Sequence, residues 1–316
     1  MADIIVSENI QGPSMDALMS DFDVHWNDSL WNDVEALTQA VSEARAIIVR
    51  NQTQINEALL TQAPNLKVIA RAGAGLDNVD TQAAVSRNIT VCYAPRENSL
   101  AVAELAMGFM LNLARFITSA NNDTKEGNWN RSQFVGTELS GKTLGVVGFG
   151  RIGQMVARRA KAFDMKLCAF DKYLPHATPV VHELDVEMLP LDEVLAASDY
   201  VSCHVPLMPD TRHLFGVEQF NQMKSGAVFI NTSRGEVVDE MALVDALVSE
   251  HLRAAATDVR ESEPPKPGGL ADLENVLVTP HIGAFSEEAQ CRVVDTVCAD
   301  VRAVLTGASP ISVFAG

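Results

Sequence analysis

The sequence predicts an α/β protein made of two doubly wound parallel-sheet domains with a cleft between them. Short apolar runs of strand-forming residues alternate with amphipathic helical patterns, which is typical of parallel sheets covered by helices on both faces. These runs fall into two sets, which a long apolar helical stretch separates. A chain of 316 residues, 47% of them hydrophobic, is long enough for two domains and a substantial core.

The first set of strands opens the chain. Its predicted members are Ile4–Ser7, Val24–Trp26, Ala46–Arg50, Leu66–Arg71 and Thr90–Tyr93. Helical patterns such as Val34–Glu43 and Ile55–Gln62 separate these strands, as crossovers between parallel strands require. Asp80 is predicted to cap the next helix, because a short acceptor side chain can bind the free amides at a helix start.

A long helix is predicted from Ser99 to about Thr124, with Ser99 as its cap. Its apolar residues lie almost all the way round, so we expect it to be buried between two bodies. The second set of strands follows it: Leu144–Val147, Lys166–Phe170, Tyr200–His204, Val228–Asn231, Ala254–Asp258 and Val276–Val278. Six strands with intervening helices meet the requirement of a doubly wound nucleotide domain.

The last predicted helix, from Ser286 to about Leu305, has no strand partner nearby and is expected to return to the first domain. The predicted domains are therefore a discontinuous one, residues 1–98 with 285–316, and a continuous one, residues 99–284.

The composition limits the possible partners. A formal net charge of −17 argues against binding to nucleic acid and to anionic membranes. The most apolar stretch, Ala101–Phe116, is interrupted by Glu104, Asn112 and Arg115, which indicates a buried helix and not a membrane span. The N-terminus begins directly on a strand pattern, with no basic leader. An anionic substrate would therefore have to be met by a local cluster of arginines.

The cysteines predict a reducing cytoplasm and no metal site. None of the five forms a CxxC pair or has metal-ligand spacing to a histidine. Cys291 and Cys298 fall on one helical face, which predicts that both pack in the core.

A glycine-rich loop follows the strand Leu144–Val147 and opens a helical run. Gly148 permits a tight turn, Gly150 lets the backbone approach a pyrophosphate, and Gly153 allows helix and strand to pack closely. The helix N-terminus adds free amides and a positive dipole end for the phosphates. The alternative is a plain glycine turn.

Asp171 stands at the end of the next strand, where an acid accepts both hydroxyls of the ribose. A carboxylate there would repel a 2′-phosphate and so favour NAD over NADP. The adjacent Lys172 could soften this preference.

Three further residues supply the groups that a hydride transfer needs. His281 can exchange a proton near neutral pH, and Glu263 can hydrogen-bond its other ring nitrogen. Arg234 has a planar fork suited to a carboxylate. Taken singly, each has a structural alternative: a salt bridge for the arginine, a solvated loop acid and a turn histidine. Glu261 competes with Glu263 for the role beside the histidine.

A second glycine loop, Gly73–Gly75, follows a strand of the first domain and can turn its amides towards an anion. The alternative is a tight strand–helix turn. Arg50 and Arg71 end neighbouring strands, and Arg96 lies near the domain junction. Arg96 either helps to bind an anionic group or pairs with Glu97.

Together, these motifs resemble the D-isomer-specific 2-hydroxyacid dehydrogenases, most closely the phosphoglycerate dehydrogenase branch in a short form without the C-terminal regulatory domain. The resemblance covers about residues 46–305. It rests on the glycine loop and on the segments Asn231–Gly235, Asp258–Pro264 and Thr279–Gly283. It implies a Rossmann-type NAD domain, a flavodoxin-like substrate domain and a homodimer formed through the NAD domain.

The resemblance also implies roles for individual residues. Arg234 would anchor the carboxylate, Glu263 would tune the base, and His281 would be the acid/base. The residues implied to bind NAD are Gly148, Gly150, Arg151, Ile152, Gly153, Asp171, His204, Val205, Pro206, Thr232, Ser233, Asp258 and Gly283. Those implied to bind substrate are Arg50, Arg71, Ala72, Gly73, Ala74, Gly75, Arg96 and Asn98. Ala74 stands where many relatives have a hydroxyl residue.

The function expected from this resemblance is NAD-dependent hydride transfer at C2 of a D-2-hydroxy acid or 2-keto acid. The first choice of substrate is 3-phosphoglycerate, and hydroxypyruvate/glycerate and sulfolactate are alternatives. An alternative of another class is an NAD(H)-sensing corepressor without turnover.

Overall fold

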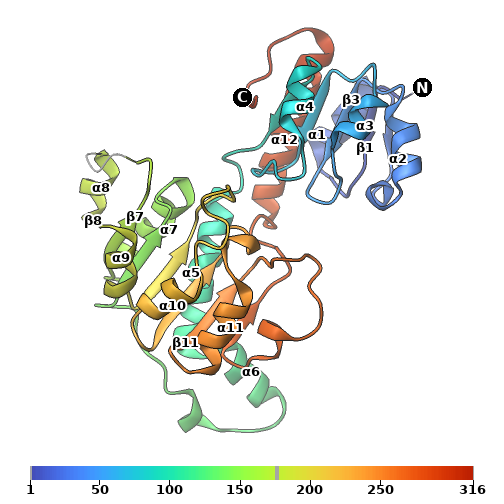
Figure 1. Cartoon of the computed structure of the whole chain (residues 1–316). Coiled ribbons are helices and arrows are strands. Elements are labelled where there is room, and N and C mark those ends of the chain that lie inside the picture. Colours follow the sequence, from blue (N-terminus) through green and yellow to red (C-terminus); the bar gives the residue numbers. More distant parts are fainter. Residues whose placement is uncertain (1, 175–177, 316) are drawn as a thin grey trace. The chain divides into compact units, whose positions relative to one another are not determined.

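The computed structural model describes residues 2–174 and 178–315. The chain forms two units, Met1–Asn98 with Ala284–Gly316, and Ser99–Gly283 (Figure 1). Each unit has its own parallel sheet, so the predicted α/β class with two parallel-sheet domains is confirmed. We call them unit 1 and unit 2.

Unit 1 has a five-stranded sheet within the described residues, in the order β2-β1-β3-β4-β5. Its strands are β1 Ile4–Val6, β2 Val24–Trp26, β3 Ala46–Val49, β4 Val68–Arg71 and β5 Thr90–Tyr93. This is the flavodoxin-like order, whose switch point, where ligands bind, lies between β1 and β3. Alternation along β1 sends Ile4 and Val6 into one buried cluster and Ile5 into the other.

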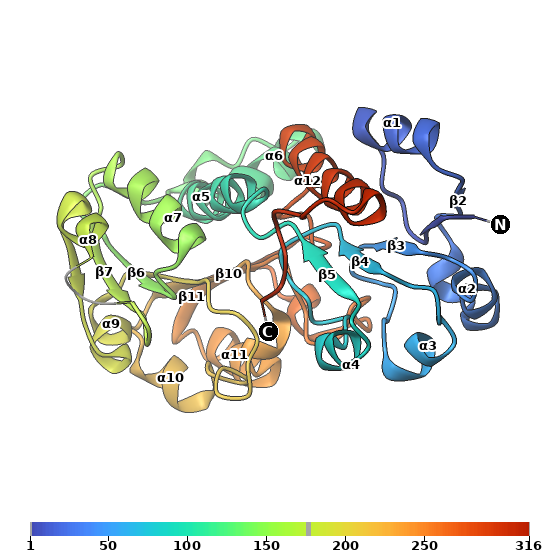
Figure 2. The same cartoon turned by 90° about the horizontal axis from the view of Figure 1, so that it is seen from above.

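Helices cover both faces of the unit 1 sheet, as Figure 2 shows. They are α1 Pro13–Asp21, α2 Val34–Val41, α3 Glu57–Thr61, α4 Thr81–Ser86 and α12 Glu287–Thr306, with the short 3-10 helix Leu30–Asn32. α12 packs on β4 and β5 and beside α1. The predicted Asp80 cap is confirmed, since its carboxylate accepts a hydrogen bond of 2.9 Å from the Ala83 amide.

Unit 2 has a seven-stranded sheet within the described residues, in the order β12-β11-β10-β9-β6-β7-β8. Its strands are β6 Thr143–Val147, β7 Lys166–Phe170, β8 Val186–Met188, β9 Tyr200–Cys203, β10 Ala227–Asn231, β11 Leu252–Thr257 and β12 Val276–Val278. The order is that of a Rossmann domain with one added strand. The prediction of six strands was wrong because β8, a three-residue edge strand with an exposed Glu187 at its centre, has no apolar run.

Two layers of helices cover the unit 2 sheet. The helices are α5 Ser99–Arg115, α6 Ile117–Lys125, α7 Arg151–Lys161, α8 Pro179–Leu184, α9 Leu191–Ala197, α10 Val217–Gln222 and α11 Glu240–Val248. Short 3-10 helices lie at Arg131–Phe134, Gly235–Val237 and Gly269–Asp272. α5 and α7 share one buried cluster, and α9, α10 and α11 share the other.

The single long helix predicted from Ser99 to Thr124 is in fact two helices. Phe116 has a left-handed φ of 53°, and the Asn112 side chain accepts a 3.0 Å hydrogen bond from the Thr118 amide at the start of α6. α5 is buried along one side. The structure describes every residue of α6, and none of them is buried.

Among the described residues, no single helix could cross a membrane. Only α5 and α6 taken together, bent by 61° at their junction, have the length and composition of a membrane span.

The cysteines differ from the prediction at one position. Cys298 is buried, but Cys291 is exposed, so only one of the two packs in the core. Cys291 lies near the start of α12, which begins at Glu287.

Candidate active site

The catalytic segments of unit 2 follow three neighbouring strands. Arg234 comes after β10, Glu263 after β11 and His281 after β12, and these strands lie side by side in the sheet. All are parallel, so their carboxyl ends meet at one edge, where α/β proteins bind ligands.

His281 and Glu263 are directly paired. The Nδ1 atom of His281 lies 2.7 Å from Oε2 of Glu263, and both side chains are about one third exposed, at 34% and 33%. The other carboxylate oxygen of Glu263 accepts a 3.1 Å hydrogen bond from the Arg260 amide. A carboxylate on Nδ1 fixes the tautomer and leaves Nε2 for proton exchange.

The pKa of Glu263 shows how its neighbours act on it. Burial raises this pKa, but the hydrogen bond and charge of His281, the Arg260 amide and the charge of Arg234 together lower it. Glu263 is therefore ionised at neutral pH, and a carboxylate facing an imidazole favours the protonated ring. The charges of Arg234 and His281 therefore both act on the Glu263 carboxylate.

The loop of His281 is held by Asp258. His281 has a left-handed φ of 56°, and its amide donates to the Asp258 carbonyl at 2.8 Å. The buried Asp258 carboxylate accepts hydrogen bonds from the Thr279 hydroxyl at 2.5 Å and from the amides of Ile282 and Gly283 at 2.8 and 2.6 Å. Burial raises the pKa of Asp258, and these donors oppose the rise. Asp258 thus fixes the turn that carries the histidine.

Arg234 is fixed by the asparagine that ends β10. The Asn231 side chain donates to the Arg234 carbonyl at 2.9 Å and accepts from the Ser233 amide at 3.0 Å. The next residue, Gly235, touches the Glu263 loop so closely that a Cβ would lie 1.9 Å from the carbonyl carbon of Arg260. The loops of Arg234 and Glu263 are therefore in backbone contact.

The nucleotide loop lies at the switch point of the unit 2 sheet, between β6 and β9. Gly148 has φ of 91°, and a Cβ there would lie 2.8 Å from the backbone of His204 and Val205. A Cβ on Gly153 would meet the Gly148 carbonyl oxygen at 2.3 Å, whereas no described atom lies within 4 Å of the same point on Gly150. The loop is closed on its packed side and open at Gly150, which fits a dinucleotide phosphate.

Asp171 is held in place by backbone amides. Its carboxylate accepts hydrogen bonds from Phe149 at 2.8 Å and from Tyr173 and Leu174, both at 2.9 Å. Lys172 next to it is paired with Asp210, with Nζ 2.5 Å from Oδ2. Because this lysine already has an anionic partner, it is poorly placed to attract a 2′-phosphate.

His204 and Thr232 carry buried polar atoms near this loop. The His204 Nε2 atom lies 2.8 Å from the Ser202 hydroxyl, and burial lowers the pKa of His204 to about 3, so the ring is neutral. Its Nδ1 atom and the Thr232 hydroxyl have no hydrogen-bond partner in the described part of the chain. Unpaired buried groups call for a partner from outside the protein, and a bound dinucleotide could supply one.

In unit 1, the predicted substrate residues follow the neighbouring strands β3, β4 and β5. The Arg50 guanidinium contacts groups without charge: the Asn9 carbonyl, the Gln290 side-chain oxygen and the ring of Phe285, 4.8 Å away. Burial lowers the pKa of Arg50, and the charge of Glu8 opposes this.

The loop after β4 depends on glycine. Gly73 has φ of 150°, and a Cβ there would lie 1.7 Å from Nη1 of Arg71, so the arginine folds across it. The Ala94 amide donates to the Gly73 carbonyl at 2.9 Å, which joins this loop to the segment of Arg96 and Asn98. Of the two alternatives for Arg96, the described residues show no ion pair with Glu97; instead the Arg96 amide binds the Glu97 carboxylate at 2.7 Å.

The buried Glu8 and the half-buried Glu240 escaped the sequence analysis. Glu8, at the switch point of unit 1, accepts hydrogen bonds from the amides of Arg50 and Thr53 at 2.7 and 3.0 Å. Glu240, at the start of α11, binds Arg260. The only feature of the sequence that could have indicated Glu8 is the position of an acid directly after a buried strand.

Among the described residues, no group of three or more His, Cys, Asp or Glu side chains is placed to hold a metal ion.

Comparisons with known proteins agree with this geometry. Residues 107–283 match the model of the D-isomer specific 2-hydroxyacid dehydrogenase, NAD binding domain. The chain is 45% identical to D-3-phosphoglycerate dehydrogenase of Methanocaldococcus jannaschii over 86% of its own length and 52% of that protein. It is also 45% identical to hydroxypyruvate reductase of Thermotoga maritima, over 82% of this chain and 84% of that one.

A solved structure from Thermus thermophilus superposes with a TM-score of 0.92 at 35% identity, covering 98% of this chain and 99% of that one. The chain therefore belongs to the D-isomer-specific 2-hydroxyacid dehydrogenase family and contains its NAD-binding domain. It spans about half the length of the first phosphoglycerate dehydrogenases that it matches.

Proposed function

We propose that this protein is an NAD-dependent oxidoreductase that transfers a hydride between the nicotinamide and C2 of a D-2-hydroxy acid or its 2-keto partner. The observation that carries the proposal is the His281–Glu263 pair, 2.7 Å apart at the carboxyl edge of a dinucleotide-binding sheet. Arg234 on the adjacent loop supplies the cation that such a substrate needs.

Each residue has one task in this mechanism. Arg234 binds the substrate carboxylate through its planar fork. His281 takes the hydroxyl proton through Nε2 during oxidation and returns it during reduction. Glu263 holds the ring and stabilises its protonated form. NAD, when bound on the glycine loop and Asp171, supplies the hydride acceptor or donor.

For cofactor choice, Asp171→Ala is expected to weaken NAD binding at least about tenfold, because a hydrogen bond to a charged acceptor contributes about 1.5–3 kcal/mol. The gap between NAD and NADP should narrow, since the carboxylate no longer repels the 2′-phosphate. Fluorescence titration with both cofactors measures the two affinities. Equal use of NAD and NADP by the unmodified protein would contradict this assignment.

We propose 3-phosphoglycerate as the first choice of substrate, with hydroxypyruvate/glycerate and sulfolactate behind it. In unit 1, the Gly73–Gly75 amides are enough for one carboxylate, so Arg50 is surplus for a simple acid. Two relatives, the phosphoglycerate dehydrogenase and the hydroxypyruvate reductase, support the first two substrates. The direct contacts of the Arg50 guanidinium are with uncharged groups, and Glu8 acts on it only through its charge, which supports a role for Arg50 in binding a second anionic group.

The expected result is that kcat/KM for phosphoglycerate or sulfolactate exceeds that for D-lactate at least about tenfold, or 1.4 kcal/mol. Arg50→Ala should remove most of this preference and leave the rate with D-lactate nearly intact. Arg45→Ala is the matched control, because Arg45 precedes β3, at the opposite end from Arg50, and pairs with Asp3 at 3.0 Å. If D-lactate proves the best substrate, Arg50 is structural.

The alternative of another class is an NAD(H)-sensing corepressor. The paired His281 and Glu263 favour an enzyme, since a nucleotide sensor has no use for a tuned acid/base. Turnover of the substrate panel with NAD separates the two functions.

We further propose a cytoplasmic homodimer formed through unit 2. Apolar side chains of this unit are exposed at Ile117 (54%), Trp129 (77%) and Val135 (78%), which favours contact with a second copy. Light scattering of the protein and of its Trp129→Lys variant tests this, because a monomeric unmodified protein excludes it. The four buried free thiols suit a reducing compartment.

A further inference from the structure

We propose that Glu240 is a positioning residue for the His281–Glu263 pair. Its carboxylate binds Arg260 and Glu261 of the loop that carries Glu263, and this holds the Glu263 carboxylate in one position against the histidine ring. The inference rests on the acid/base role proposed for His281, and the experiment below separates a failure of that role from a failure of the inference.

Glu240 accepts three hydrogen bonds from this loop. Its Oε1 and Oε2 atoms accept hydrogen bonds from Nε and Nη2 of Arg260, both at 2.9 Å, and Oε1 also accepts one from the Glu261 amide at 2.8 Å. The Arg260 and Glu240 side chains are only 10% and 20% exposed. A two-pronged, shielded pair of this kind is stronger and better oriented than an exposed ion pair.

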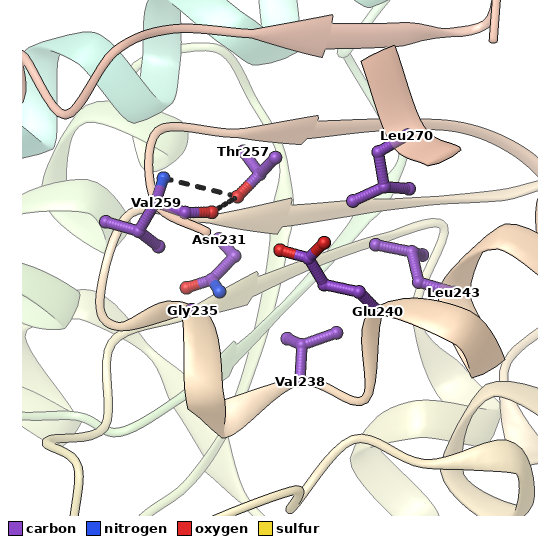
Figure 3. A pocket seen from close by; sticks show the side chains of 8 residues that line it. All are labelled: Asn231, Gly235, Val238, Glu240, Leu243, Thr257, Val259 and Leu270. Carbon is purple, nitrogen blue, oxygen red and sulfur yellow. Dashed lines mark hydrogen bonds between the residues drawn. The ribbon is translucent and has the colours of Figure 1, made fainter. Parts of the chain in front are cut away.

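Glu240 is itself firmly placed. It is the first residue of α11, whose N-cap, Asp239, accepts hydrogen bonds from Met241 and Ala242, both at 3.1 Å. Figure 3 shows its carboxylate directed into a small cavity, with Asn231 and Thr257 of the neighbouring strands on the wall. The cavity measures about 10 Å³, about the size of one water molecule.

From this anchor the contacts run to the histidine in two steps. The Arg260 amide binds Oε1 of Glu263 at 3.1 Å, and Oε2 of Glu263 binds His281 at 2.7 Å. Glu240 thus fixes both the side chain of Arg260 and the amide that follows it, and the Arg260 amide fixes the carboxylate that faces the catalytic ring. A second tie, from Glu261 to His213 at 2.5 Å, holds the outer side of the loop.

The charges around the pair are arranged in two shells. Glu263 and Asp258 act on His281 directly, and Arg234 acts on Glu263. Behind them, the described charged or titratable partners are Arg260, Glu240, Glu261 and His213. Burial raises the pKa of Glu240, but the hydrogen bonds and charge of Arg260 and the Glu261 amide lower it overall, so Glu240 is ionised at neutral pH.

The experiment compares Glu240→Gln with Glu263→Gln. Reduction needs protonated His281, so the rate of reduction falls as the pH rises through the titration of this histidine. We call this falling part of the pH–rate profile the rate limb. Loss of the facing carboxylate favours the neutral ring, so Glu263→Gln should move this limb to lower pH. Glu240→Gln should move it in the same direction by a smaller amount, because the loosened Glu263 meets the ring less often.

A second readout is independent of turnover. The His281 ring proton is followed by NMR titration in the protein without cofactor, with His281→Asn used for assignment. Its midpoint should move in Glu240→Gln as the rate limb does, while NAD affinity stays unchanged. Arg260→Gln breaks the same contact from the other side and should reproduce the shift, which keeps the test decisive if Glu240→Gln folds poorly.

Asp199→Asn is the matched control. Asp199 also accepts a backbone amide, Thr143 at 2.8 Å, and a basic side chain, Lys224 at 3.2 Å, but it lies at the amino edge of the sheet. It should leave the limb in place. The double variant of Glu240 and Glu263 should show no shift beyond that of Glu263→Gln alone.

The outcomes separate cleanly. If the rate limb of Glu263→Gln lies at the same pH as that of the unmodified protein, the acid/base assignment in the proposed function is wrong. A limb that responds to Glu263→Gln but not to Glu240→Gln or Arg260→Gln overturns only the inference. Full additivity in the double variant does the same, because Glu240 would then act without Glu263.

Discussion

His281→Ala is expected to lower kcat by roughly 10²–10⁴-fold, the usual contribution of general acid–base catalysis. NAD affinity should remain near that of the unmodified protein, because the histidine and the glycine loop follow different strands of the unit 2 sheet. The loss should appear in both directions, since the same ring takes the proton in oxidation and returns it in reduction.

The measurement is steady-state turnover in both directions together with cofactor titration. His25→Ala is the control, because His25 lies exposed on β2 of unit 1 and should affect neither quantity. If cofactor affinity collapses together with the rate, His281 is a structural residue of its loop and the proposed mechanism is wrong.

The fold was largely predictable because the periodicity of apolar residues is a local signal. Strands such as β3 are buried along their whole length and stand out as unbroken apolar runs. β8 carried no such signal, since its centre, Glu187, faces solvent at the sheet edge. The break at Phe116 was missed because the apolar pattern does not show which polar side chains bind the free amides of a new helix. Here the Asn112 side chain of α5 accepts a hydrogen bond from the Thr118 amide at the start of α6.

The candidate site was predictable only where its residues stand in compact motifs. His281 and Arg234 each follow a strand that the pattern locates, so their shared edge could be inferred. The contacts around the site residues join distant positions: Glu240 binds Arg260 in unit 2, and Glu8 binds the Arg50 amide in unit 1. No short-range spacing encodes such pairs, because they exist only after separate strands and helices have packed together.

Gly235→Ala is expected to lower kcat at least about a hundredfold, because a displacement of about 1 Å in a catalytic group can have that effect. Gly235 does not have a positive φ, so alanine fits its backbone, and the conflict is steric. The new Cβ would lie 1.9 Å from the Arg260 carbonyl carbon and 2.4 Å from the Glu261 amide nitrogen, both backbone atoms. The loop must move away, and Glu263 moves with it.

Such crowding costs about 1–3 kcal/mol of stability, so thermal unfolding is measured alongside kcat and NAD affinity. The folded variant should keep its NAD affinity, and its rate limb should shift to lower pH as Glu263 leaves the ring. Gly108→Ala in α5 is the control: no described atom lies within 4 Å of its new Cβ, and an alanine there should stabilise by roughly 0.5–1 kcal/mol. A Gly235→Ala variant with unchanged kcat and an unmoved limb would show that backbone contact does not set the position of Glu263.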